Sequence, residues 1–189
     1  PDPQVSKAIV SADDEIDRWD VQIEEDCLKI LALHQPVADN LRRVAAVMKI
    51  ANELERVADI AVNIAERAQG LVGISKLMVP EKLPEMAHVA LEMLRQALDA
   101  FVQLDSKKAR AVCDQDEYVD QMNREIIEIL LGQMRSSPDL IEASLHLFSA
   151  SRHIERIADH ATNIAEDVVY LVEGCIIRHK AELRLHSAD

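Results

Sequence analysis

The chain contains the same twelve-residue pattern twice, one hundred residues apart. Residues 55–66 read ERVADIAVNIAE and residues 155–166 read ERIADHATNIAE, so nine of the twelve positions are identical. Self-similarity of this kind indicates one structural unit used twice. The chain is therefore restricted to folds that two copies of a small unit can form together.

The match extends towards the amino terminus at a slightly different spacing. Residues 13–17 (DDEID) resemble residues 116–120 (DEYVD) at an offset of 103. The change from 103 to 100 predicts a loop between the two motifs, marked by Pro36 in one copy and by Ser136-Ser137-Pro138 in the other. We divide the chain into residues 1–75 and 76–189, with paired helices at about 3–33 and 37–69, and again at about 106–134 and 139–173.

A further helix, at about 82–104, precedes the second pair only. Asp2 and Asp105 are expected as N-caps, and Gly70 and Gly174 as C-terminal stops. The first copy begins without the extra helix, so we expect that helix to be missing there. Its absence should leave an apolar stripe exposed on the first copy, to be covered by a second chain or by a further helix. That stripe comprises Ile9, Ile16, Ile23, Ile30 and their neighbours.

Composition indicates that the whole fold is helical. Hydrophobic residues make up 49% of the chain, which is enough for a sizeable core, whereas aromatic residues make up only 3% and there are four glycines. Strand packing and tight turns need more of both. We therefore predict an all-α protein.

Charge and cysteine content restrict partners and location. A formal net charge of −13 repels the phosphates of nucleic acids, so we expect no nucleic-acid partner. The three cysteines are far apart and form no CxxC pair, which favours reduced thiols in the cytoplasm. The sequence has no apolar run long enough to span a membrane, and residues 1–4 do not resemble a signal peptide, so we expect no membrane insertion.

Acidic pairs at helical spacing are the main candidate site. The pattern E/D-x-x-x-D occurs four times, and each pair lies on one face of its helix. A solvated helix face is one interpretation. The other is metal binding, because converging carboxylates suit Mg²⁺, Mn²⁺ or iron. The pairs are Asp13/Asp17, Glu55/Asp59, Asp116/Asp120 and Glu155/Asp159.

Other polar patterns are weaker. His146, His153 and His160 recur every seven residues, and we interpret them as packed side chains rather than metal ligands. Glu85 and His88 match half of the di-iron carboxylate motif, but no second half is present, which counts against a di-iron enzyme. No sequence motif for a nucleophile or a phosphate loop is found, so we predict that the protein is not an enzyme.

The repeated blocks resemble the PhoU family, and the resemblance covers essentially the whole chain. It includes DDEID, LALHQPVADNLRRV and ELERVADIAVNIAERA in the first copy. In the second copy it includes LPEMAHVALEMLRQALDAFVQLD and RHIERIADHATNIAEDVVYLVEG, followed by Arg178-His179. The chain departs from the family where Ala58-Asp59 and Ala158-Asp159 replace the usual Gly-Asp, and where Tyr118 interrupts the acidic stretch.

The resemblance implies two tandem three-helix bundles related by pseudo-twofold symmetry. It implies a negative regulator of phosphate uptake and of phosphate-starvation signalling, acting between the ATPase of the phosphate ABC transporter and a sensor histidine kinase. It also implies metal ions (iron, manganese, magnesium or zinc), and a homodimer is expected. The alternative is a metal-storing or structural bundle unconnected to phosphate. The implied metal ligands are Asp13, Asp17, Glu55, Asp59, Asn63, Asp116, Asp120, Glu155, Asp159 and Asn163.

Overall fold

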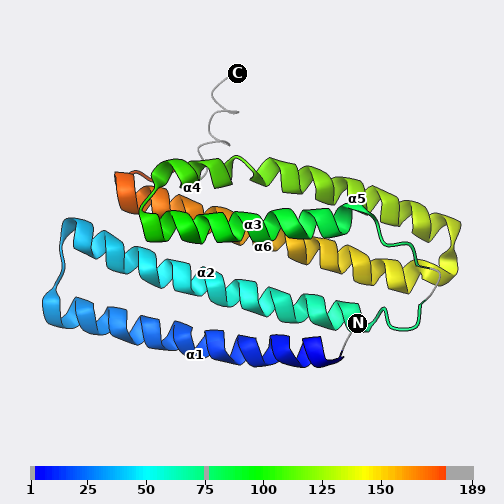
Figure 1. The fold of residues 1–189 in the computed structure, drawn as a ribbon, viewed down its shortest axis with the longest axis horizontal. Coiled ribbons are helices and arrows are strands. Elements are labelled where there is room, and N and C mark those ends of the chain that lie inside the picture. Colours follow the sequence, from blue (N-terminus) through cyan, green and yellow to red (C-terminus); the bar gives the residue numbers. More distant parts are fainter. Residues whose placement is uncertain (1–2, 75–76, 178–189) are drawn as a thin grey trace, which may run out of the picture.

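The protein is helical throughout the part that the structure describes. This computed structural model describes residues 3–74 and 77–177, and within them there are helices and no strand, which confirms the all-α prediction. The long helices lie side by side along the longest axis of the molecule (Figure 1). They are α1 (Pro3–His34), α2 (Ala38–Gln69), α3 (Lys82–Gln103), α4 (Ser106–Cys113), α5 (Asp116–Ser136) and α6 (Ile141–Glu173), with a short 3₁₀ turn, η1 (Pro138–Leu140).

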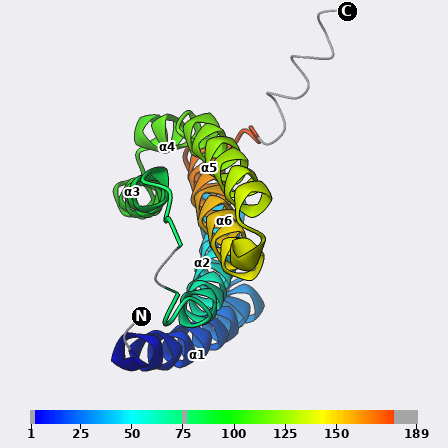
Figure 2. The ribbon, with the colours of Figure 1, turned by 90° about the vertical axis from the view of Figure 1, so that its right-hand side faces the viewer.

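The two helices that carry the repeated motif, α2 and α6, pack against each other at the centre. Helix α1 covers the outer side of α2, whereas α3, α4 and α5 cover α6 (Figure 2). Each repeat thus contributes its motif helix to a shared interface. The second repeat adds α3 in front of its pair, as the sequence predicted.

Contacts between α2 and α6 show that these helices run antiparallel. Lys49 bonds to Asp167 near one end of the crossing, and Gly70 lies against His146 near the other. Ala58 and Ala158, which are equivalent in the repeat, lie between these contacts and are both buried. Equivalent residues at the centre of an antiparallel pair are what a pseudo-twofold axis produces. Small side chains there let the helices approach closely.

The apolar stripe of the first repeat is less buried than its counterpart. Val112, Val119 and Ile126 have no exposed surface, because α3 helps to cover this side of the second repeat. The equivalent residues Ile9, Ile16 and Ile23 are only half-buried, and Ile30 is 41% exposed. The predicted difference between the copies is confirmed. What covers the first stripe remains a prediction.

One predicted helix is broken in the structure. Residues 106–134 were expected to form a single helix, but it is divided at Asp114 and Gln115. The side-chain amide of Gln115 donates to the carbonyl of Ala111 at 3.1 Å, while its backbone N–H donates to Val112 at 3.0 Å. A side chain that takes over a helix carbonyl interrupts the regular hydrogen bonding and produces such a break.

The predicted helix ends are partly confirmed. Asp105 caps α4 by accepting from the backbone N–H groups of Lys107 and Lys108, each at 3.0 Å. Gly174 ends α6 in the left-handed conformation with φ 69°. Gly70 does not, because its φ of −64° is right-handed. Asp2 lies outside the described residues.

Membrane insertion was not expected from the sequence. No helix in the described ranges has both the length and the apolar character needed to cross a bilayer.

Candidate functional site

Four of the predicted ligands form the first acidic cluster, Asp13 and Asp17 on α1 with Glu55 and Asp59 on α2. Burial raises the pKa of Asp13, and the charges of Asp17 and Asp59 raise it further. Burial also raises the pKa of Glu55, with a further increase from Asp59 on its own helix and from Asp20 and Asp17 on α1. These mutual effects cross from one helix to the other. The packing of α1 on α2 therefore brings the two predicted pairs together.

The equivalent residues form the second acidic cluster, Asp116 and Asp120 on α5 with Glu155 and Asp159 on α6. Burial raises the pKa of Asp159 to about 6, helped by the charges of Glu155, Asp116 and Asp120. Burial is also the main reason that the pKa of Asp116 and that of Glu155 are raised. The second cluster therefore holds negative charge that repels itself in a partly dehydrated place.

Polar neighbours orient the carboxylates of the second cluster. Thr162 donates to Asp116 at 3.2 Å, and Arg152 pairs with Glu155 at 2.7 Å. Tyr118, the residue that departs from the acidic pattern, points elsewhere, since its hydroxyl donates to Glu85 at 3.0 Å. That bond gives Glu85 a structural partner outside the cluster.

The clusters have the donor chemistry of a cation site. Their ligands are carboxylate oxygens, which suit hard or borderline divalent ions. Two side-chain oxygens, Oδ1 of Asp13 in the first cluster and Oδ1 of Asn123 beside Glu155, are buried and accept no hydrogen bond from the described residues. Such oxygens can bind a cation. Across residues 3–74 and 77–177, however, no three His, Cys, Asp or Glu side chains are already gathered as a metal-binding group.

The two predicted asparagines lie apart from the carboxylates that they were expected to assist. The amide of Asn163 donates across the α2–α6 interface to Glu53 at 3.2 Å. The amide of Asn63 donates to the backbone carbonyl of Asp59 at 2.8 Å. Neither contact involves a carboxylate of the acidic clusters.

Sequence reasoning missed a polar network at this interface. Glu53 lies 2.5 Å from Nδ1 of His160, and Lys49 pairs at 3.0 Å with Asp167, which is only 2% exposed. Lys49 also lies over the ring of Tyr170, 5.9 Å from its centre. The available signal was an aspartate at position 167 within an apolar run of α6.

The three histidines lie along α6, half-buried or buried, as the packing interpretation predicted. His146 lies against Gly70 and His160 against Glu53. Burial lowers the pKa of His153, and the positive charges of Arg156 and Arg67 lower it further. His153 is therefore close to two cations.

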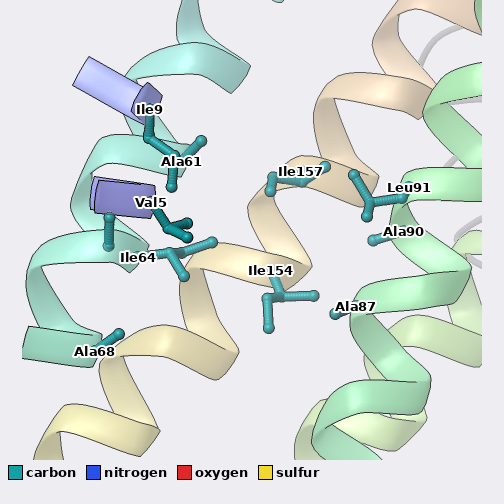
Figure 3. A pocket seen from close by; sticks show the side chains of 11 residues that line it. Val5, Ile9, Ala61, Ile64, Ala68, Ala87, Ala90, Leu91, Ile154 and Ile157 are labelled. Atoms are coloured by element: carbon teal, nitrogen blue, oxygen red, sulfur yellow. The ribbon is translucent and has the colours of Figure 1, made fainter. Parts of the chain in front are cut away.

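An apolar pocket of about 420 Å³ opens beside the first repeat (Figure 3). Val5 and Ile9 of α1 face Ile154 and Ile157 of α6 across it, with Ile64 of α2 between. The repeat explains its position. Its α2 lining is equivalent to residues of α6 that are fully buried in the second repeat, where α3 lies alongside. That lining is Ala61, Ile64, Ala65 and Ala68, equivalent to Ala161, Ile164, Ala165 and Val168.

These features define a class of protein: an all-helical chain of two repeats, joined through their motif helices, with an acidic cluster on each repeat. Comparison with known proteins identifies the family. The PhoU domain matches residues 1–68 and 83–168, and the chain belongs to the PhoU family.

Relatives and solved structures agree with this membership. The chain is 36% identical to the phosphate-specific transport system accessory protein PhoU homolog of Aquifex aeolicus, over 94% of this chain and 80% of that protein. It is 39% identical to the homolog of Zymomonas mobilis, over 76% and 61%. The crystal structure of PhoU from Pseudomonas aeruginosa superposes with a TM-score of 0.87 at 34% identity, covering 92% of this chain and 84% of that one. The phosphate transport system regulatory protein PhoU from Streptococcus pneumoniae gives 0.84 at 29% identity, covering 92% and 82%.

Proposed function

We propose that this protein is an accessory regulator of phosphate transport that represses phosphate uptake and the phosphate-starvation response. The observation that carries the proposal is its similarity along both repeats to proteins named phosphate-specific transport system accessory protein. In this proposal it acts by binding and not by catalysis. It works in the cytoplasm, as a homodimer.

The proposed partners are the ATPase of the phosphate ABC transporter and the cytoplasmic region of a sensor histidine kinase. The net charge of −13 supports basic partner surfaces, since opposite charge speeds encounter. The acidic clusters on the two repeats supply part of that charge on partly accessible helix faces. Binding should therefore weaken as salt is added.

We also propose that each acidic cluster holds divalent or iron ions when metal is supplied. The mutually raised pKa values of Asp159, Asp116 and Glu155 support this, because their repulsion is relieved by a cation. Asp13, Asp17, Glu55 and Asp59 would hold one site, and Asp116, Asp120, Glu155 and Asp159 the other. A bound ion would neutralise part of the acidic surface and so change which partner surface fits.

A deletion strain tests the regulatory role. Without the protein, reporters of phosphate-scavenging genes should be active even in high phosphate. Repression returns with the wild-type gene. If the reporter stays silent in the deletion strain, the regulatory proposal is wrong and a metal-storing or structural bundle is the better description.

Two further measurements separate the parts of the proposal. Glu55→Gln/Glu155→Gln should fail to restore repression if the acidic clusters form the working surface. Asp59→Asn/Asp159→Asn should lose metal measured by elemental analysis after loading with Mn²⁺ or iron. Unchanged metal in that double variant would refute the metal assignment and leave regulation intact.

A further inference from the structure

The pseudo-twofold axis between α2 and α6 allows the two ends of their interface to be compared residue by residue. Repeat equivalence at an offset of 100 relates each polar position at one end to a position at the other. Polar residues at one end are thus matched by a different set at the second. The positions Lys49, Glu53, His160, Asn163 and Asp167 correspond to Ser149, His153, Ile60, Asn63 and Arg67.

The first end is internally paired. Asp167 accepts from Lys49 at 3.0 Å, and Glu53 meets both His160 and Asn163. Two carboxylates there face one lysine and one histidine. The polar groups of this end satisfy one another without an added ion.

The second end has basic residues where the first has carboxylates. Arg67 stands in the place of Asp167, and His153 in the place of Glu53. Asn63, which has no carboxylate opposite, turns its amide back to its own helix. Arg156 lies near His153 as well, close enough for its charge to act on the imidazole ring.

The donors of this end have no acceptor in the protein. Nε of Arg67 and Nδ1 of His153 are buried and make no hydrogen bond with any described residue. Neither Arg67 nor Arg156 pairs with a carboxylate in residues 3–74 and 77–177, although the chain carries 34 acidic residues. Buried donors without acceptors are destabilising, and they are a common sign of a missing ligand.

We propose that Arg67, His153 and Arg156 form a binding site for a small oxyanion of the phosphate type. Guanidinium groups bind such ions through paired, charge-assisted hydrogen bonds. The donors come from two facing helices, and a tetrahedral ion offers acceptors in several directions, whereas a carboxylate offers them in one plane. Arg67 and His153 are half-buried and not enclosed, so an ion reaches them from solvent.

This site lies at the interface of the two repeats, where α2 meets α6, and it uses none of the residues proposed as metal ligands. An anion bound there would contact both repeats at once. It would therefore stabilise their packing, because any ligand that binds only the folded state does so. The inference does not depend on the regulatory role or on metal binding.

The test is titration of the purified, metal-free protein with inorganic phosphate at constant ionic strength, followed by calorimetry and by the NMR signals of the His153 ring. Phosphate should bind and shift those signals, whereas equal chloride should not. Arg67→Gln should weaken binding by about tenfold or more, the loss expected for a charged hydrogen bond. Arg67→Lys, which keeps the charge but removes Nε, should lose part of the affinity.

Arg56→Gln is the matched control, because Arg56 is the repeat equivalent of Arg156 and bonds to Asn52 at the surface. It should bind phosphate like the wild type. The proposal is overturned if phosphate leaves the His153 signals of the wild-type protein unmoved. It is also overturned if folded Arg67→Gln binds as tightly as Arg56→Gln.

Discussion

Gly70, at the end of α2, lies against the imidazole ring of His146 on α6, so closely that a Cβ at residue 70 would meet Nε2 at 2.5 Å. The backbone of Gly70 is right-handed and would accept any residue. Glycine is therefore needed here for close approach and not for an unusual φ. The contact fixes how the two repeats meet at one end of their interface.

Gly70→Ala should destabilise the protein by about 1 kcal/mol, because overpacking forces neighbouring side chains out of place. In a His146→Ala background the same change should be neutral or stabilising, since alanine restricts the unfolded chain. Urea unfolding of the four proteins measures this coupling. Gly132→Ala, with nothing within 4 Å of its new Cβ, serves as the control and should stabilise. Additive effects of the two substitutions would contradict the contact.

Lys49→Met should destabilise the protein by about 2 kcal/mol, because it removes a cation from the buried carboxylate of Asp167. Methionine keeps most of the aliphatic stem, so the loss reports on the ion pair. Lys29→Met is the comparison, as its partners Glu25 and Asp26 are exposed, and it should leave the melting temperature unchanged. Equal effects of the two substitutions would show that burial of Asp167 does not matter.

Asp159→Asn should raise the melting temperature of the metal-free protein at pH 7. The substitution removes a charge that its neighbours Glu155, Asp116 and Asp120 repel. The same variant should lose the gain in melting temperature that Mn²⁺ gives to the wild type. Asp139→Asn, on the exposed turn before α6, should behave like the wild type in both assays. A variant that is less stable without metal would refute the repulsion.

Stability of the metal-free protein should fall as pH rises from about 4 to about 6. The pKa of Asp159 is raised from 3.8 to about 6, so in this window the folded state holds a proton that the unfolded state has lost. Above pH 6 both states are ionised and the decrease is complete. Melting temperatures across this range provide the measurement, and Asp159→Asn should flatten the slope.

A second pH effect has the opposite sign. The hydrogen bond from Arg110 lowers the pKa of Glu173 from 4.5 to about 2, so this carboxylate adds stability above pH 4.5 that is lost as pH falls towards 2. Glu173→Gln should therefore flatten the acid side of the profile and leave the slope above pH 5 unchanged. A profile with no change on the acid side would exclude the Arg110 pair as its source.

The sequence predicted the helices and the acidic pairs because both depend on spacing along one helix. Val112, Val119 and Ile126 follow the helical period, and so do Glu55 and Asp59. Pairing of the motif helices and the difference between the two apolar stripes follow from the repeat itself.

What could not be predicted depends on contacts between distant residues. Glu53 and His160 are 107 positions apart, and no local pattern marks them as neighbours. Gly70 was assigned to a left-handed turn, because close approach to His146 leaves no mark in the sequence near it. The break at Gln115 depends on where one amide side chain donates.

The axis between α2 and α6 also bears on how the two halves of the chain diverge. In a dimer of identical chains, every substitution near such an axis is made twice, once on each side. Joining the halves in one polypeptide removes that constraint, so position 67 became arginine while position 167 became aspartate. A symmetric assembly could not keep one end neutralised from within and leave the other unneutralised. The duplicated chain can, and the two ends of a single helix crossing are free to take different tasks.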